Sequence, residues 1–425
     1  MVAPALIMTL AIAIFAGALA VIATERVDRT KVAMVGAALL LVTQTIDQEV
    51  AIEAIDWNTL GLLAGMMLIV RLTETTGVYT YLAIRAAQLS GGRPLLVVIA
   101  LALATGVLSA FLDNLTTVLL MVPITFLLAD ALDVDPIPLI VIEVMASNIG
   151  GTATLIGDPP NILIAGATDL TFGQFIGNLA PIALVVLLLV TGLLYLGYRR
   201  RLQVAPEAHE RVLELDARRS IEDPDEARRT IPVLLLTIVA FFLHKPLHLE
   251  PATVALVGAT LMLVVSRQPL SGALAGIEWP TLFFFLSLFV MVGALEHTGF
   301  MADVADAVAD VTGGDRTAEL IGILWTAGIA SGVVDNIPFT AAMIPVVEQL
   351  TLDNAGDTAY WWALAMGACF GGNLLLISAA ANVAAAGLAE RAGRPIGFVP
   401  FLKAGVPVVL VSLLLSTAYL GVRYL

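Results

Sequence analysis

One stretch of this sequence combines polar side chains with residues that interrupt helices. Residues 145–162 read Met-Ala-Ser-Asn-Ile-Gly-Gly-Thr-Ala-Thr-Leu-Ile-Gly-Asp-Pro-Pro-Asn-Ile, and apolar residues typical of helices precede and follow them. Gly and Pro release backbone groups from the helical hydrogen-bond ladder, and within a membrane these groups must be satisfied by protein or by water. Such an interruption is the best indication of a transporter's binding site that a sequence offers. The alternative is a polar loop between two short helices.

The carboxyl group of Asp158 has the chemistry to couple transport to an ion gradient. A carboxylate near the centre of a bilayer costs at least ~2.5–3.5 kcal/mol, so a function is expected for it. Carboxylate, amide and hydroxyl oxygens suit Na⁺, and a partly desolvated carboxyl group can instead take up a proton. We therefore predict that Asp158 carries H⁺ or Na⁺, with Asn148 and Thr152 as further ligands in the case of Na⁺.

Two further carboxylates, Asp113 and Asp335, are each followed by an asparagine and lie between apolar arms that we expect to form hairpins. At a hairpin tip within the membrane, each is a candidate ligand for the solute or for the coupling ion. The alternative is a capping role, because Asp and Asn accept hydrogen bonds from the first N–H groups of a helix. The residues leave both interpretations open, and Asp113 is the second candidate for the coupling ion.

The remaining candidates are polar or small residues at the same tips and breaks. The complete candidate set for binding the solute or the ion is Asp113, Asn114, Thr116, Thr117, Ser147, Asn148, Gly150, Gly151, Thr152, Thr154, Asp158, Asn161, Asp335, Asn336, Thr340, Cys369, Gly372, Asn373, Ser378 and Asn382. For Asn373, Ser378 and Asn382, hydrogen bonds that satisfy a broken helix are an equal alternative. Cys369 is also explained as a small core residue. We expect helices to start near Leu115, Leu155, Ile162, Ile337 and Val383, where their positive dipole ends would face an anionic or polar solute. We expect no buried Arg or Lys beside either motif.

Composition indicates a membrane protein. The chain has 425 residues, of which 59% are hydrophobic and 13% charged, and its mean hydropathy is +0.95. Soluble domains carry about 25% charged residues, so we expect a polytopic protein surrounded by membrane lipid. The net charge of −14 argues against nucleic acid as a partner. A single cysteine excludes an internal disulfide, and no residue spacing indicates a resident metal, a cofactor or an enzyme.

The two halves of the chain repeat each other. A shift of 222 positions places many residues of the range 32–123 on identical residues of the range 254–345 without a gap, including both Asp-Asn pairs. The two broken segments align after a one-residue deletion. Asp158 then aligns with Ala379. A residue needed for structure common to both halves would occur in both, so this asymmetry favours a coupling role for Asp158.

The repeat suggests the domain organisation and the topology. We predict a first repeat at 1–198 with a hairpin at 94–130 and a broken helix at 137–167, a charged linker at 199–230, and a second repeat at 231–425 with a hairpin at 316–350 and a broken helix at 360–388. The predicted fold is all-α and polytopic, with about ten transmembrane helices plus two re-entrant hairpins and two broken helices. An odd number of crossings per half inverts the second repeat. Because Lys and Arg favour the cytoplasm, both termini are expected outside and the linker inside.

With these motifs in place, the chain resembles the ion transporter superfamily, and within it the arsenical-pump membrane protein (ArsB), the P protein and the citrate-transporter-like permeases. The matching residues are Asp113-Asn114, Asp335-Asn336, Ser147-Asn148-Ile149-Gly150-Gly151-Thr152, Ile156-Gly157-Asp158-Pro159-Pro160-Asn161, Gly371-Gly372-Asn373 and Ala381-Asn382-Val383. The resemblance implies a scaffold domain, a transport domain with two opposed hairpins, and pairing into a homodimer. The dicarboxylate branch has Ser-Asn-Thr at its hairpin tips, and this sequence departs from that pattern.

These observations predict a secondary active transporter of the inner (plasma) membrane that works by alternating access. The resemblance to the arsenical-pump membrane protein implies export of arsenite or antimonite in exchange for protons, and this is the activity that we predict. For an arsenical pump, a soluble ATPase subunit would be a further partner. The alternatives are a Na⁺/H⁺ antiporter and a sodium-coupled anion or dicarboxylate transporter. A channel is the alternative from another class, and saturable counterflow separates it from a transporter.

Overall fold

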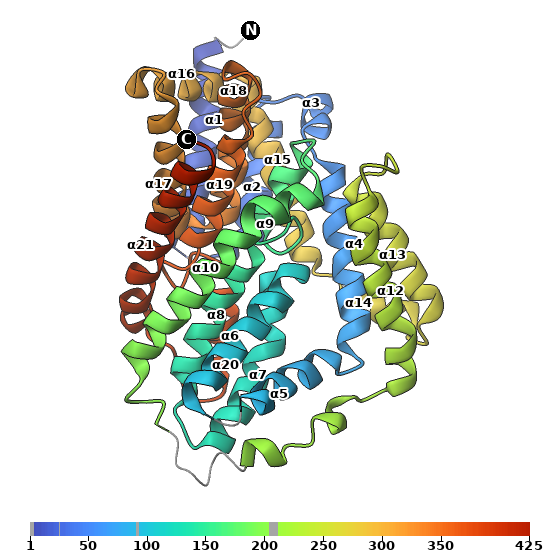
Figure 1. The fold of residues 1–425 in the computed structure, drawn as a ribbon. Helices are drawn as coiled ribbons and strands as arrows, with labels where there is room; N and C mark the ends of the chain where they lie inside the picture. The colour runs from blue at the N-terminus through green and yellow to red at the C-terminus, as the bar shows by residue number, and fades with distance from the viewer. Residues whose placement is uncertain (1–3, 25, 91–92, 204–210) are drawn as a thin grey trace.

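The computed structural model describes residues 4–24, 26–90, 93–203 and 211–425, which are largely helical and contain no β-strand. The predicted all-α, polytopic fold is confirmed (Figure 1). Seven helices of the described residues are long and apolar enough to cross a membrane, and the number rises to eight if α4 and α5, bent by 68°, form one span. Residues 1–3, 25 and 91–92 of the predicted first repeat, and 204–210 of the predicted linker, lie outside the described residues.

The helices of the two halves follow the same order. The first half contains α1 (Pro4–Ile22), α2 (Arg29–Val42), α3 (Gln48–Glu53), α4 (Trp57–Glu74), α5 (Val78–Leu89), α6 (Pro94–Phe111), α7 (Asn114–Leu132), α8 (Pro136–Gly151), α9 (Pro159–Gly166) and α10 (Phe172–Tyr198). After η1 (Ala217–Ser220), the second half contains α12 (Pro224–Leu243), α13 (Pro251–Val265), α14 (Leu270–Ala275), α15 (Trp279–His297), α16 (Phe300–Thr312), α17 (Arg316–Val334), α18 (Asn336–Asp353), α19 (Ala359–Gly371), α20 (Ala380–Arg391) and α21 (Phe398–Arg423). The helix α12 begins inside the range predicted as linker.

The equivalent helices α5 and α16 lie at opposite ends of the molecule (Figure 1). The bounds of α3 and α14 differ by the same 222 positions that relate the two halves of the sequence. Figure 1 shows α5 near the lower end and its counterpart α16 near the upper end. This arrangement is the inverted repeat that an odd number of crossings in each half requires.

Local sequence explains where the helices on either side of the breaks begin. The carboxylate of Asp113 accepts a hydrogen bond from the Thr116 backbone N–H and so caps α7. The prediction of a helix start near Leu155 is wrong, because α9 begins at Pro159. Pro159 and Pro160 lack N–H donors, which a helix tolerates in its first turn only.

The helices pack into two groups. The scaffold bundle consists of α1, α2, α4, α12, α13 and α15, in which α4 packs on α13 and α2 on α15. The core bundle consists of α6 to α10 and α17 to α21, in which α6 packs on α8 and α17 on α19. The hairpin helix α7 packs on α20, and α18 packs on α9, so each hairpin contacts the broken helix of the other half. The two bundles contact each other less extensively, through helix pairs such as α4 with α9 and α15 with α18.

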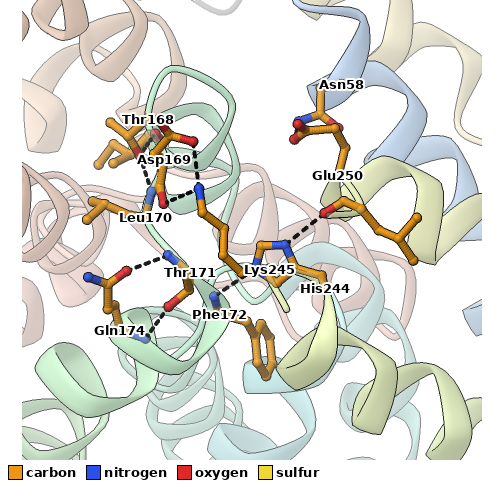
Figure 2. A network of polar contacts seen from close by, with 12 residues as sticks. Asn58, Thr168, Asp169, Leu170, Thr171, Phe172, Gln174, His244, Lys245 and Glu250 are labelled. Carbon is orange, nitrogen blue, oxygen red and sulfur yellow. Dashed lines mark hydrogen bonds and ion pairs between the residues drawn. The ribbon is translucent and has the colours of Figure 1, made fainter. Parts of the chain in front are cut away.

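A polar contact joins the bundles between the loop before α10 and the loop before α13 (Figure 2). Lys245 Nζ lies 2.7 Å from Asp169 Oδ1. The buried His244 ring binds on both sides: Nδ1 lies 3.1 Å from Leu249 O, and Nε2 accepts a hydrogen bond from the Phe172 N–H at 3.5 Å. The core and scaffold therefore meet here through side chains outside the spanning helices.

We expect the contact between Lys245 and Asp169 to weaken in acid. The hydrogen bond from Lys245, together with its charge, lowers the pKa of the Asp169 carboxyl group below its ordinary value. A group whose pKa is lowered by folding stabilises the protein above its unfolded pKa, and this contribution disappears as the pH falls through the folded pKa. A chemical-shift titration of the Asp169 carboxyl carbon measures this midpoint. Lys245→Gln should raise the midpoint, and an unchanged midpoint would contradict the assignment.

Candidate ion- and solute-binding site

The two hairpin tips meet at the carboxyl group of Asp158. Asp158 is 0% exposed, and its Oδ1 accepts hydrogen bonds from Asn114 Nδ2 at 3.2 Å and from Asn336 Nδ2 at 3.4 Å. Asn114 is the first residue of α7 and Asn336 the first of α18. One carboxylate of the first broken helix therefore binds the tip of each hairpin.

Asn148 connects this carboxylate site to the second broken helix. Its Oδ1 accepts a hydrogen bond from Asn114 Nδ2 at 3.2 Å. Its Nδ2 donates to Asn373 Oδ1 and to Asn382 Oδ1, each at 3.0 Å. The structure thus brings six of the predicted site residues into one buried network, which we call the amide network: Asn114, Asn148, Asp158, Asn336, Asn373 and Asn382.

Two atoms of the amide network have no hydrogen-bond partner among the described residues, Asp158 Oδ2 and Asn373 Nδ2. The groups that do bind Asp158 are neutral amides. A buried charge is costly unless it is paired, so a charged Asp158 requires a cation. Either a proton on the carboxyl group or a Na⁺ bound by its oxygens would meet this requirement.

Other predicted site residues satisfy the backbone of the unwound segments. Asn161 Nδ2 donates to Thr152 O at 3.0 Å and to Thr154 O at 2.7 Å. In the second half, Asn382 Nδ2 donates to Gly372 O at 2.8 Å. Each broken helix therefore uses an asparagine of its own half to replace lost helical hydrogen bonds, as interrupted helices in a membrane require.

Hydroxyl groups hold the unwound segments against the hairpins. The hydroxyl group of Thr154 donates to Ala110 O in the first half. The hydroxyl group of Ser378 donates to Gly332 O in the second half. Ser147 Oγ lies within hydrogen-bonding distance of Ser109 Oγ at 3.0 Å and of Asn114 O at 3.2 Å. These residues position the hairpin tips around Asp158.

The capping interpretation describes the geometry of Asp113. Its Oδ1 lies 2.8 Å from the Thr116 N and its Oδ2 lies 2.5 Å from Thr116 Oγ1. Thr117 Oγ1 donates to Asp113 O at 2.9 Å, and Thr340 Oγ1 donates to Asn336 O at 2.7 Å. These threonines therefore serve their own helix starts. A role for Asp113 as the second coupling site stays a prediction.

Of the predicted Na⁺ ligands, Thr152 is held by its own helix. Thr152 Oγ1 donates to Asn148 O at 3.0 Å. Cys369 is 0% exposed, and its Sγ lies 3.7 Å from Asn161 Oδ1. The single thiol therefore packs against the first broken helix from the second half.

Close approach of the backbone explains two of the predicted glycines. A Cβ atom on Gly150 would lie 2.2 Å from Gly106 O, and one on Gly151 would lie 2.6 Å from Gly157 O. At Gly372, the nearest atom, Cys369 O, would lie 3.3 Å away. Gly150 therefore allows α8 to approach α6 closely.

Gly150→Ala should destabilise the protein. The added methyl group meets the α6 backbone, which cannot turn away as a flexible side chain would, and overpacking of this kind costs about 1–3 kcal/mol. Thermal unfolding of the purified protein in detergent measures the effect. Gly192→Ala in α10 is the control, because no atom lies within 4 Å of its Cβ position. Equal melting temperatures for the two variants would contradict the packing argument.

Arg29 lies at the site although it is not among the candidates that the sequence analysis named. Its Nη1 is 3.0 Å from Asp335 Oδ2, and its guanidinium carbon is 5.0 Å from the centroid of the Phe284 ring. The sequence analysis expected no buried Arg or Lys beside the motifs; Arg29 is only partly buried, with 24% of its side chain exposed, but it does contact the second hairpin tip. The two residues are 306 positions apart, so no local pattern reveals the contact. One signal was available: a positive charge at the first residue of an apolar helix is unfavourable unless an acid compensates it.

A cavity of about 400 Å³ lies beside this ion pair, between the two bundles. Arg29, Asp335 and the first turns of α7 and α20 line it, through Leu115 and Ala380 among others. A smaller neighbouring cavity shares Arg29, Leu115 and Ala380 with it and is also lined by Asn114 and Asn336 of the amide network. The larger cavity therefore adjoins the site at Asp158.

Sequence analysis also missed Glu143 of α8. The side chain is 1% exposed, and its Oε1 accepts a hydrogen bond from the hydroxyl group of Thr125. Its Oε2 has no partner in the part of the chain that the structure describes. An acidic residue within the apolar run of α8 was the available signal.

Broken helices, re-entrant hairpins and a buried carboxylate next to a cavity between two bundles define a multi-pass membrane transporter. The chain belongs to the citrate transporter family, whose family model matches residues 19–367. The family predicted from the motifs is thereby confirmed.

Several relatives are transporters by name. An uncharacterized transporter of Mycobacterium tuberculosis is 43% identical over 424 residues, which cover 98% of each chain. The P protein of Homo sapiens is 34% identical over 506 residues, which cover 98% of this chain and 60% of the P protein. The crystal structure of the YdaH transporter of Alcanivorax borkumensis has a TM-score of 0.56 at 18% identity, covering 86% of this chain and 85% of YdaH, and shows similarity of fold.

Proposed function

We propose that the protein is a secondary active transporter in which Asp158 carries the coupling cation, H⁺ or Na⁺. The observation that supports this most directly is the unpartnered Oδ2 of a fully buried carboxyl group whose other oxygen binds neutral amides. Without a cation, a charged Asp158 would be uncompensated in a low-dielectric environment. Cation binding would therefore control whether the core bundle can move relative to the scaffold bundle.

For the solute, we propose arsenite or antimonite that leaves the cell in exchange for protons. As(OH)₃ and Sb(OH)₃ are small and neutral, and their hydroxyl groups can bond to amides such as Asn114 and Asn336, which line the cavity next to Asp158. Cys369 does not line this cavity, so recognition would use hydroxyl groups and not a thiol. Na⁺/H⁺ antiport is the alternative, and it would need no solute site besides the amide network, because Asp158 would bind Na⁺ and H⁺ in turn.

Sodium-coupled transport of a small organic anion is the second candidate, and Arg29 favours it. A guanidinium group at the cavity wall, next to the positive end of the α20 dipole, suits a carboxylate. The match to the citrate transporter model points in the same direction. The hairpin tips, Asp-Asn-Leu-Thr and Asp-Asn-Ile-Pro, differ from the Ser-Asn-Thr of dicarboxylate transporters.

The setting of this function follows from the charge distribution. We propose an inner (plasma) membrane location, with both termini outside and the Arg-rich linker in the cytoplasm. A homodimer, and a soluble ATPase subunit in the case of an arsenical pump, are the proposed protein partners.

Transport into proteoliposomes tests the function. Radiolabelled arsenite and radiolabelled citrate would be offered separately under an imposed pH gradient, with and without a Na⁺ gradient. Accumulation of arsenite driven by the pH gradient supports proton-coupled export, and accumulation of citrate driven by Na⁺ selects the second candidate. Loss of the pH gradient on adding Na⁺ alone selects Na⁺/H⁺ antiport. Solute flux that does not saturate and that no gradient drives would contradict a secondary transporter.

A further inference from the structure

Arg29 and Asp335 form an ion pair across the boundary between the bundles. We propose that Arg29 is a positioning residue: through this pair it holds the core bundle in one of its two transport positions. The proposal rests on the proposed function, because alternating access requires the core bundle to occupy two positions relative to the scaffold bundle.

The guanidinium group is fixed to the scaffold bundle. Arg29 is the first residue of α2, which packs on α15. The neighbouring Thr30 Oγ1 donates to Pro280 O at 3.0 Å, and the Arg29 guanidinium group lies over the Phe284 ring. The Arg29 side chain is 24% exposed. It therefore cannot follow a large displacement of the core bundle.

The carboxylate is fixed to the core bundle. Asp335 Oδ1 accepts a hydrogen bond from the Ile337 N–H at 2.9 Å, which leaves Oδ2 for Arg29. The next residue, Asn336, donates its N–H to Ser378 O at 3.3 Å and so ties the tip to the second broken helix. Asp335 is 5% exposed, so loss of its partner would leave a buried charge uncompensated.

The backbone at this tip also depends on its surroundings. Asp335 has φ 153° and ψ 138°, a conformation that a residue with a side chain rarely adopts. Its counterpart in the first half, Asp113, has ordinary extended values of φ −68° and ψ 154°. The ion pair therefore supports a tip conformation that the other hairpin does not have.

The repeat indicates why the pair belongs to one position. In a transporter built from an inverted repeat, each half adopts in the second position the conformation that the other half has in the first. The loop before α13, which is the counterpart of the loop before α2, would then approach the tip at Asp113. The residue equivalent to Arg29 is Pro251, and Glu250 precedes it. A proline next to an acid cannot pair with Asp113. The position in which Arg29 meets Asp335 therefore has an ion pair that the equivalent residue, Pro251, cannot form in the opposite position.

Thiol labelling at two equivalent sites tests this proposal. In a Cys369→Ala background, one protein carries Ala384→Cys in the cavity beside Arg29, and a second carries the counterpart Leu163→Cys. The probe is N-ethylmaleimide, applied to proteoliposomes. The labelling rate at Ala384→Cys divided by the rate at Leu163→Cys reports the population of the position seen here relative to its opposite. This holds whichever of the two positions is more populated.

Arg29→Gln should lower this ratio at least about fivefold, as expected for a coupling between two states. Asp335→Asn should lower it as well, and Arg29→Lys should keep most of it. Retention of the ratio by Arg29→Lys, which keeps the charge but not the shape of the guanidinium group, is an outcome that a merely structural role of Arg29 would not allow. Lys31→Gln is the control, because Lys31 is exposed on the same helix.

An unchanged ratio in Arg29→Gln would overturn the proposal. A ratio that falls in Arg29→Gln but stays unchanged in Asp335→Asn, which keeps the oxygen that accepts the Ile337 N–H, would also overturn it, because pairing would then be irrelevant. The measurement needs no transported solute, so it is independent of the coupling role of Asp158. Absence of labelling at Leu163→Cys in every variant would instead contradict alternating access itself.

Discussion

Asp158→Asn should abolish gradient-driven accumulation while the protein stays folded. The asparagine keeps an oxygen for the hydrogen bonds from Asn114 and Asn336, and it has nearly the same shape. It can neither take up a proton nor supply a negative charge to Na⁺. Because interactions with a charged group are worth about 1.5–3 kcal/mol each, affinity for the coupling cation should fall about ten- to a hundredfold.

Two measurements separate loss of coupling from loss of transport. Accumulation against a gradient should disappear in Asp158→Asn, whereas exchange of labelled for unlabelled solute at equal concentrations should persist, since a neutral site is free to move. Asp133→Asn is the matched control, because Asp133 is exposed and its left-handed φ of 55° suits asparagine. Full accumulation by Asp158→Asn would move the coupling role to Asp113.

Asn148→Ala should reduce both stability and transport, because Asn148 is the hub of the amide network. The substitution removes the partner of Asn373 Oδ1 and of Asn382 Oδ1, and one acceptor of Asn114 Nδ2. Side-chain hydrogen bonds in a bilayer average about 0.6 kcal/mol, and each buried group left unsatisfied costs about 1–3 kcal/mol, so we expect a loss of about 2–4 kcal/mol.

Thermal unfolding in detergent and a solute-binding assay check this expectation together. Asn178→Ala is the control: its Oδ1 accepts hydrogen bonds from Arg423 Nη2 at 2.9 Å and from Tyr424 Oη at 2.5 Å, but at a partly exposed position where water can replace them. We expect the control to bind solute normally. Equal loss of stability in the two variants would show that burial of the network does not matter.

Much of the fold could be predicted from the sequence, because the membrane restricts what an apolar chain can do. Backbone groups in lipid must bond internally, so long apolar runs become helices, and Gly and Pro mark where they stop. The helices α3 and α14 differ by the 222-residue shift that the sequence reveals. The error at Leu155 arose where one polar stretch offered more than one helix start, and the side-chain geometry of Pro159 settled it.

The sequence by itself determined the residue types of the site. Asp158 and five asparagines occur at the breaks and hairpin tips, which are the features of a sequence that indicate a transporter's binding site. Tertiary structure alone decided which of them touch: Asn114 and Asn336 converge on Asp158, whereas Asp113 caps its own helix. It also placed Arg29 against Asp335. The physical reason is that helix starts and stops follow from local backbone chemistry, whereas contacts between residues 306 positions apart depend on how whole helices pack.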